Sequence, residues 1–245
     1  MKMPHGKQFY MISTPTTPPL TRKDVGKTVI VMKALIFGDT HGDAFMLEIL
    51  KRKAEQAETV FCLGDLTIFG EELNYMLTIL DEFPAPVYLI HGNHETEDEM
   101  KQAVKKHTNI TYVHKQQVKA GEFTIIGYGG DGFSKHDEEF ETSFEKSSKE
   151  LKEPHKTVVL LHGPPAETRL DIPFDNHHSG SESYREFIEA YEPLIVFSGH
   201  IHECEGEYDL IGETILHNPG PEGTLIDLGE LSRNRTASKK NQNTQ

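Results

Sequence analysis

The feature that most constrains this fold is an apolar stretch that ends in a carboxylate and an imidazole. Residues 29–37 are almost continuously β-branched or aliphatic, which is typical of a strand buried on both faces of a sheet. Gly38 and Gly42 allow tight turns around Asp39 and His41, and residues 44–57 have the apolar spacing of an amphipathic helix. Asp39 and His41 are therefore predicted in the loop at the carboxyl end of a strand, where open α/β sheets place their chemistry.

The same pattern of an apolar strand followed by polar side chains recurs four more times. Strands are predicted at 59–63, 86–90, 157–161 and 194–198. The polar residues that follow them are Asp65, Asn93, His94, His162, His200 and His202. Because neighbouring strands end on one rim of a sheet, these side chains are expected to converge. The alternation of strands and helices predicts the α/β class, as a four-layer α/β/β/α sandwich of two mixed β-sheets flanked by helices.

Composition bounds the domain organisation and the partners. The chain has 245 residues, enough for one substantial core, and we expect a single domain over 29–231. Residues 1–28 are polar and rich in Pro and Thr, which predicts a disordered N-terminal extension, and the polar, basic segment 232–245 predicts a disordered tail. The net charge of −14 disfavours nucleic acid as a partner.

Neither a membrane nor an oxidising compartment is indicated. No apolar run approaches 18 residues, so no membrane span is expected, and the N-terminus lacks the apolar region of a signal peptide. Two cysteines cannot form a disulfide framework. The cytoplasm is the predicted location, and the oligomeric state stays open.

The ligand types indicate metal chemistry. Two carboxylates, one amide and five imidazoles are more than a single zinc ion needs. Oxygen and nitrogen ligands without thiolate suit Mn²⁺, Fe, Zn²⁺ or Mg²⁺. With two metals about 4 Å apart, a carboxylate can bridge them through its two oxygens. Taken singly, each residue is as well explained as a turn residue, a helix cap or a solvated loop histidine.

The motifs, taken in order, resemble those of the calcineurin-like metallophosphoesterase superfamily. They are Gly38-Asp39-Thr-His41, Gly64-Asp65, Gly92-Asn93-His94, His162, Gly199-His200-Ile-His202 and Asn218-Pro219-Gly220. The stretches Leu161-His-Gly-Pro-Pro165, Leu170-Asp171 and Gly199-His-Ile-His-Glu203 are most similar to the small prokaryotic branch called Icc-related phosphoesterases. The resemblance implies the metallophosphoesterase fold.

The resemblance also implies a dinuclear centre and a reaction. The first metal would be bound by Asp39, His41, Asp65 and His202, and the second by Asp65, Asn93, His162 and His200. Mn²⁺ is the metal expected in vitro, with Fe, Zn²⁺, Mg²⁺ or Ni²⁺ as alternatives. A hydroxide bridging the ions would attack phosphorus in a phosphomonoester or phosphodiester of a small molecule, a nucleotide among the candidates. His94 would be the catalytic residue, donating to a phosphoryl oxygen or to the leaving group.

The sequence departs from one branch of the family at two positions. Protein phosphatases of the superfamily carry an aspartate and an arginine where this chain has Ile68 and Phe69. The departure disfavours protein phosphatase activity and leaves His94 without an identified orienting partner. Substrate contacts are expected from Asn93, His94, Arg169 and His178, the last two on the loop after His162. The alternatives left open are a non-catalytic metal-binding interaction module on the same fold, and a nuclease.

Overall fold

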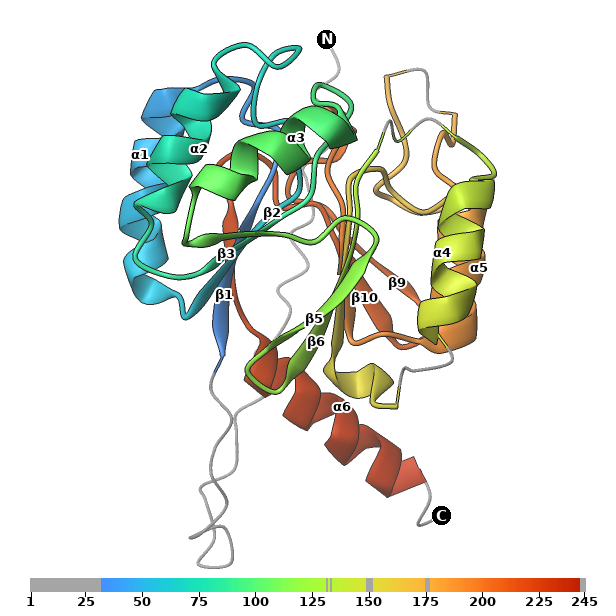
Figure 1. Ribbon diagram of the computed structural model, residues 1–245. Helices are drawn as coiled ribbons and strands as arrows, with labels where there is room; N and C mark the ends of the chain where they lie inside the picture. The colour runs from blue at the N-terminus through green and yellow to red at the C-terminus, as the bar shows by residue number, and fades with distance from the viewer. Residues whose placement is uncertain (1–31, 131, 133, 149–151, 175–176, 243–245) are drawn as a thin grey trace, which may run out of the picture.

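The computed structural model describes residues 32–242 except 131, 133, 149–151 and 175–176 (Figure 1). The predicted extension over 1–28 lies outside the described residues. The strands are β1 (Lys33–Phe37), β2 (Thr59–Cys62), β3 (Val87–Leu89), β4 (Ile110–Tyr112), β5 (Gln116–Ala120), β6 (Phe123–Tyr128), β7 (Thr157–Leu161), β8 (Ile195–Phe197), β9 (Tyr208–Ile211), β10 (Thr214–His217) and β11 (Thr224–Asp227). The helices are α1 (Ala44–Lys53), α2 (Leu73–Asp81), α3 (Glu97–Ala103), α4 (Glu138–Ser148), α5 (Glu182–Tyr191) and α6 (Leu228–Gln242).

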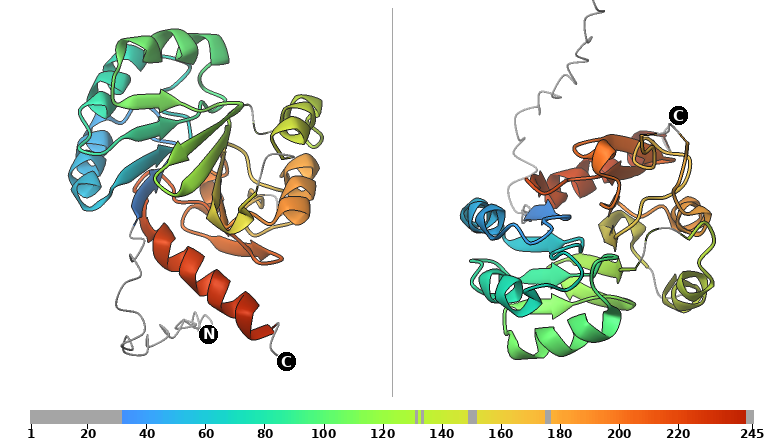
Figure 2. Two further views of the ribbon diagram at one scale, coloured as in Figure 1. Left: turned by 60° about the horizontal axis from the view of Figure 1, so that its bottom comes forward. Right: turned by 90° about the horizontal axis from the view of Figure 1, so that it is seen from above.

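Two mixed sheets face each other between two sets of helices. One sheet has the order β11-β1-β2-β3-β4 and the other β5-β6-β7-β8-β10-β9. The strands β1 to β4 run parallel, as do β6, β7, β8 and β10, whereas β11, β5 and β9 are antiparallel to their neighbours. Helices α1 to α3 lie on one outer flank and α4 and α5 on the other (Figure 2). The predicted four-layer fold is confirmed.

The strand β1 shows why an uninterrupted apolar run was needed. Ala34 and Ile36 pack into the core between the two sheets, and Leu35 and Phe37 pack beneath the helices on the outer face. Successive side chains of a strand point to opposite faces, so burial on both sides requires an apolar residue at every position. A third cluster fills the space between the second sheet and helices α4 and α5.

The register of the parallel strands brings their carboxyl ends to one level. Phe37 pairs with Cys62 and Cys62 with Leu89, and in the second sheet Leu160 pairs with Phe197. The loops that follow these strands gather at the same end of the molecule, at the top of Figure 1. This geometry places the loops that carry the candidate ligands side by side.

The segment 232–245, for which a disordered tail is predicted, is helical in the structure as far as Gln242. Helix α6 runs to Gln242, and the predicted boundary at 231 falls inside it. The helix begins on the buried Leu228, and the half-buried Leu231 packs against the core between the sheets. Arg235 then donates hydrogen bonds from its guanidinium to the carbonyls of Pro193 and Glu192, at 2.6 and 2.9 Å. The polar composition of this segment gives no indication of these few anchoring contacts.

Candidate metal centre

The seven predicted ligands come together at the rim where the strands end. Four of them have left-handed backbone conformations, with φ of +56° for Asp39, +45° for His41, +47° for Asp65 and +69° for His200. Such conformations are uncommon for residues other than glycine, and they concentrate at functional sites because the surroundings must hold them in place. Among the described residues, four of the nine non-glycine residues with positive φ are thus candidate ligands.

One cluster consists of Asp39, His41 and His202, whose ligand atoms all lie within 4.8 Å of one another. The Nε2 atoms of His41 and His202 are 3.0 Å apart. Asp39 is buried and accepts the backbone N–H of His200 on both carboxylate oxygens, at 3.2 Å. Burial raises the pKa of Asp39 to about 6, because the buried carboxylate loses the water that would stabilise its charge.

A second cluster consists of Asp65, His162 and His200, again with ligand atoms within 4.8 Å. Asn93 Oδ1 lies between the two imidazoles, 3.0 Å from His162 Nε2 and 2.9 Å from His200 Nδ1. His162 Nδ1 lies 2.9 Å from the carbonyl of Leu63, to which it can donate, and this leaves Nε2 as the ligand atom facing Asp65 and Asn93. Hydrogen bonds of this kind fix the tautomer of metal-binding histidines.

Asp65 belongs to the second cluster and also approaches the first. Its Oδ2 is 3.5 Å from His162 Nε2 and 4.0 Å from His41 Nε2. Burial alone would raise the pKa of Asp65, but the hydrogen bond and charge of His162 outweigh it, and the pKa falls to about 2. Burial likewise opposes the charged form of His162, yet Asp65 raises the pKa of that imidazole to about 9. This carboxylate is therefore placed to serve both clusters.

The donor chemistry fits divalent metal ions. Asp39, Asp65, Asn93 and the imidazoles present oxygen and nitrogen atoms without thiolate, the set that suits Mn²⁺, Fe, Zn²⁺ or Mg²⁺. Apart from these two clusters, among the described residues only the overlapping set of His41, Asp65 and His94 brings three such ligand atoms together. The structure therefore brings oxygen and nitrogen donors together in two groups, with Asp65 within reach of both.

Glycines of the motifs are required by close packing at the site. A Cβ added to Gly92 would lie 2.1 Å from Asp65 Oδ1, and one added to Gly199 would lie 2.3 Å from Asp39 Oδ2. Real Cβ atoms essentially never approach that closely. Gly92, which precedes Asn93, and Gly199, which precedes His200, therefore make room for a carboxylate from another loop.

His94 has a partner that the sequence did not reveal. Its Nδ1 accepts a hydrogen bond of 3.2 Å from the backbone N–H of Phe69, and the Phe69 ring stacks on it with centroids 4.6 Å apart. An accepting Nδ1 assigns the proton of the neutral ring to Nε2, which is 4.0 Å from Asp65 Oδ2. The His94 backbone N–H also donates to Asp65 Oδ1 at 2.9 Å. The residue is thus fixed at the edge of the clusters.

Glu95 is a site residue that the sequence reasoning missed. It is buried, and its Oε1 accepts from both the backbone N–H and the hydroxyl of Thr67 at 2.8 Å. Its other oxygen accepts the backbone N–H of Gly92 at 3.3 Å. Glu95 therefore ties the loop after β2 to the loop after β3. The one available signal was a carboxylate directly after the Asn-His pair.

The two other predicted substrate contacts have structural partners instead. Arg169 pairs with Glu207, with 3.0 Å between Nη2 and Oε2. His178 donates from Nδ1 to the buried Asp171 at 2.6 Å, within the loop after β7. These contacts account for both side chains without a substrate, so their roles in binding remain predictions.

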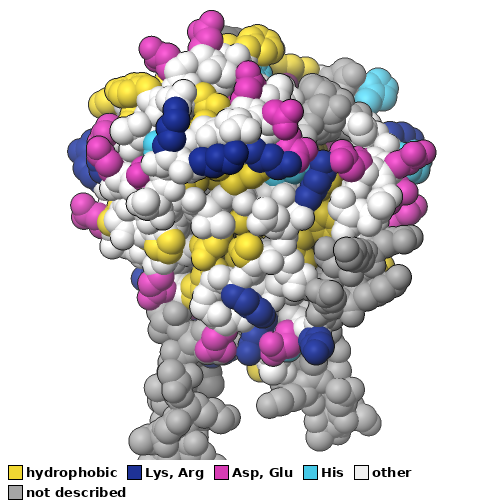
Figure 3. All heavy atoms as spheres, viewed as in Figure 1, with side chains coloured by type: hydrophobic (Ala, Val, Ile, Leu, Met, Phe, Trp, Pro, Cys, Tyr) yellow, Lys and Arg dark blue, Asp and Glu magenta, His cyan; other side chains and the backbone are white. Residues whose placement is uncertain are grey.

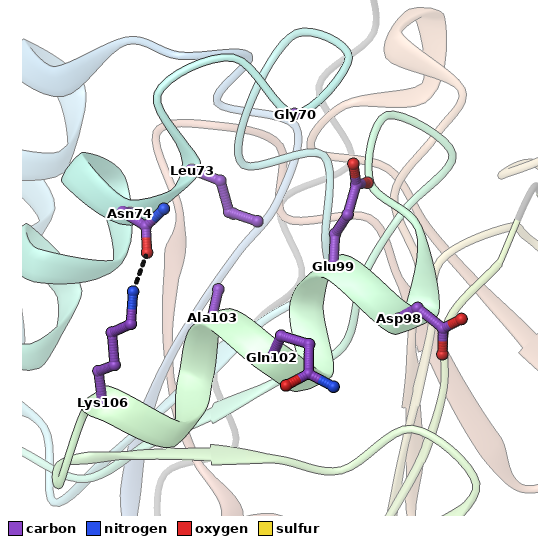
Figure 4. A pocket seen from close by; sticks show the side chains of 8 residues that line it. All are labelled: Gly70, Leu73, Asn74, Asp98, Glu99, Gln102, Ala103 and Lys106. Atoms are coloured by element: carbon purple, nitrogen blue, oxygen red, sulfur yellow. Dashed lines mark hydrogen bonds between the residues drawn. The ribbon is translucent and has the colours of Figure 1, made fainter.

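A groove of about 560 Å³ between α2 and α3 is a separate feature (Figure 4). Its lining comprises Gly70, Leu73, Asn74, Asp98, Glu99, Gln102, Ala103 and Lys106, and includes none of the seven candidate ligands. Some of its polar groups already have partners, since Lys106 reaches Asn74 and Glu99 completes a capping box with Thr96. The groove is therefore a weaker candidate for the functional site than the clusters at the strand ends.

The architecture and the clusters together define a metallophosphoesterase fold. A sequence model of the family described as calcineurin-like phosphoesterase matches residues 32–204. The chain belongs to the calcineurin-like phosphoesterase family, as the motifs predicted. No curated protein matches the sequence.

Solved structures with the same fold come from distant organisms. The protein TT1561 of Thermus thermophilus is 19% identical, with a TM-score of 0.65 over 82% of this chain and 96% of that one. A dimetal phosphatase from Danio rerio is 14% identical, with a TM-score of 0.53 over 79% of this chain and 89% of that one. The purple acid phosphatase PPD1 of yellow lupin is 15% identical, with a TM-score of 0.54 over 82% of this chain and 46% of that one. At these identities the likeness establishes the fold.

Membership of the family supports hydrolysis of phosphate esters with divalent metal ions. No helix among the described residues is long and apolar enough to cross a membrane.

Proposed function

We propose that this protein is a dinuclear metal-dependent phosphoesterase that hydrolyses a phosphomonoester or phosphodiester bond of a small molecule. The observation that carries the proposal is the pair of neighbouring three-ligand clusters, of which the second contains Asp65. Asp39, His41 and His202 would hold one ion, Asn93, His162 and His200 would hold the other, and Asp65 would be a ligand of both. Two ions bound there would polarise the phosphoryl oxygens and lower the pKa of a water between them.

The chain's own residues supply orientation and hydrogen bonds. With its Nδ1 held by the Phe69 N–H, His94 would donate to a phosphoryl oxygen from Nε2, which lies 4.0 Å from Asp65 Oδ2. A donor placed in this way stabilises charge that develops on that oxygen. Asp39 and Asp65 accept the backbone N–H groups of His200 and His94 and so hold the loops of other strands, which orients the ligands before any ion binds.

A small substrate agrees with the charge of the chain. The net charge of −14 disfavours a nuclease, because binding to nucleic acid depends on neutralising phosphates. The complete set of ligands and the presence of His94 disfavour a non-catalytic interaction module. Mn²⁺ as the metal in vitro, a nucleotide as substrate and a location in the cytoplasm belong to the same proposal.

The test combines metal counting with turnover. Protein loaded with Mn²⁺ should bind two ions per chain and hydrolyse p-nitrophenyl phosphate or its bis ester. His94→Ala should lower kcat by at least about 100-fold while the metal count stays near two, because His94 acts on the substrate. The control is His136→Ala, which removes an exposed imidazole paired with Glu182 and should leave turnover unchanged.

Each contrary result has a separate meaning. Two bound ions without hydrolysis of either ester would refute the phosphoesterase. Fewer than one ion per chain at saturating Mn²⁺ would favour the interaction module. Loss of metal in His94→Ala would make His94 a ligand, as its grouping with His41 and Asp65 allows.

A further inference from the structure

Core packing does not explain why an aromatic residue occupies position 69. It is 79% exposed, and its backbone has a φ of +50°. A bulky residue in the left-handed region is a strained outlier, and such strain is found preferentially at functional sites. The neighbouring Ile68 is also exposed, so the turn presents two apolar side chains to water.

This turn lies directly beside the metal-binding clusters. The Phe69 ring stacks on the His94 ring with centroids 4.6 Å apart and an interplanar angle of 29°. The His94 ring meets the His41 ring edge-on, with centroids 4.8 Å apart. Phe69 therefore lies one ring beyond the residue that would contact the phosphoryl group. Figure 3 shows exposed hydrophobic side chains at this end of the molecule.

The contact with His94 leaves most of the Phe69 ring available. A stacked pair covers one face of each ring, and the high exposure of Phe69 shows that its remaining surface meets solvent. A planar leaving group that extends from the phosphoryl site past His94 would reach this surface. Aromatic stacking tolerates many planar partners, because every aromatic group has a π face.

We propose that Phe69 is a stacking platform for the leaving group, and that the substrate is a phosphate ester of a planar aromatic group such as an aryl alcohol or a nucleoside. The proposal rests on the phosphoesterase function and narrows it to a class of substrate. Ile68 and Phe69 replace the two polar residues that protein phosphatases of the superfamily carry here. In their place the turn offers an apolar surface together with the backbone N–H that holds His94.

The test compares two phosphonates that the enzyme cannot hydrolyse. Phenylphosphonate and methylphosphonate share the head group and differ in the planar ring, so the ratio of their Kd values isolates stacking. On Mn²⁺-loaded protein, calorimetry should give a Kd for phenylphosphonate roughly tenfold lower than for methylphosphonate. Phe69→Ala should remove this preference and leave the Kd for methylphosphonate unchanged, whereas Phe69→Tyr should retain it.

Two further variants test whether the preference for phenylphosphonate depends on Phe69 itself. Phe45→Ala removes an aromatic ring of similar exposure, 72%, from α1 and should keep the preference for phenylphosphonate. Phe69→Trp introduces the only tryptophan of the chain, because the sequence has none. Its fluorescence should change with phenylphosphonate and stay constant with methylphosphonate.

Three outcomes would overturn the platform. They are a wild-type protein with equal affinity for the two phosphonates, a Phe69→Ala variant that keeps the preference, and a Phe69→Ala variant that loses both ligands equally. The last would make Phe69 a positioning residue for His94. Failure of the phosphoesterase function itself is recognised separately, by the absence of ester hydrolysis in wild-type protein that has two metals bound.

Discussion

Gly92 offers a test of the site that changes no ligand and no charge. An added Cβ at this position would lie 2.1 Å from Asp65 Oδ1 and 2.5 Å from His162 Cε1. Both neighbours belong to the cluster that would hold the second ion. Gly92 itself needs no left-handed conformation. The substitution Gly92→Ala therefore acts through contact alone.

The size of the effect follows from these distances. Ordinary van der Waals contact begins at 3.4 Å, so the Asp65 carboxylate must retreat by about 1.3 Å from its 2.1 Å approach. Metal sites tolerate distance errors of only about 0.2 Å, and a misplacement near 1 Å costs on the order of 100-fold in rate. We therefore expect kcat/KM to fall at least 100-fold and the metal count to drop below two. Overpacking of this kind costs about 1–3 kcal/mol, so the variant should remain folded with a Tm several degrees lower.

The assay measures metal content, hydrolysis of bis-p-nitrophenyl phosphate and thermal unfolding on the same preparations. Gly212→Ala is the matched control, because Gly212 has a φ of +58° and an added Cβ would lie 3.6 Å from Glu192 Oε1, an ordinary contact in the turn between β9 and β10. This control should lose about 1 kcal/mol of stability and no activity. A Gly92→Ala enzyme that keeps two metals and turns over within a few-fold of wild type would refute the packing argument.

Two further predictions concern stability. Arg235→Met should lower the free energy of unfolding by about 2–3 kcal/mol, because the carbonyls of Pro193 and Glu192 lose their charged donor. Urea unfolding measures this change. A loss below about 0.5 kcal/mol, the range of an ordinary surface substitution, would contradict the anchoring of α6. His217 is buried, and burial lowers its pKa to about 4, whereas the unfolded chain has the ordinary value near 6.5. The unfolded state therefore binds the extra proton between these values, and stability should fall by up to roughly 1.4 kcal/mol per pH unit as the pH drops from 6.5 to 4. Urea unfolding at several pH values should show a shallower fall in His217→Gln, and equal slopes would contradict the assignment.

The sheets and the convergence of ligands could be predicted because both depend on local pattern. A run such as Ala34-Leu-Ile-Phe37 has no polar position, so it fits only a strand covered on both faces. The parallel register then carries Asp39, Asp65 and Asn93 to the same rim. Elementary geometry sufficed for that step, whereas the division of the residues between two ions came from the family resemblance.

The contacts that hold the site could not be predicted, because they join side chains to the backbone of remote loops. The bond from the Phe69 N–H to His94 involves no side-chain donor, so no residue type in the sequence announces it. Glu95 resembles any acidic residue near a helix start until its partners in the loop after β2 are known. Helix α6 has almost no apolar stripe, and it depends on Arg235 and on a few residues at its start.

The residues that hold the loops of this site together are largely the same residues that are candidate metal ligands. Asp39 accepts the N–H of His200 from 161 positions away, and Asp65 accepts the N–H of His94 from 29 positions away. Each carboxylate therefore fixes a loop of another strand while it presents its oxygens to the cluster. This double use explains how strained left-handed backbones persist at Asp39, Asp65 and His200, because each is held by a bond from a neighbouring loop. The fold and the site therefore depend on the same interactions, since the hydrogen bonds that join the loops at the strand ends also orient the candidate ligands.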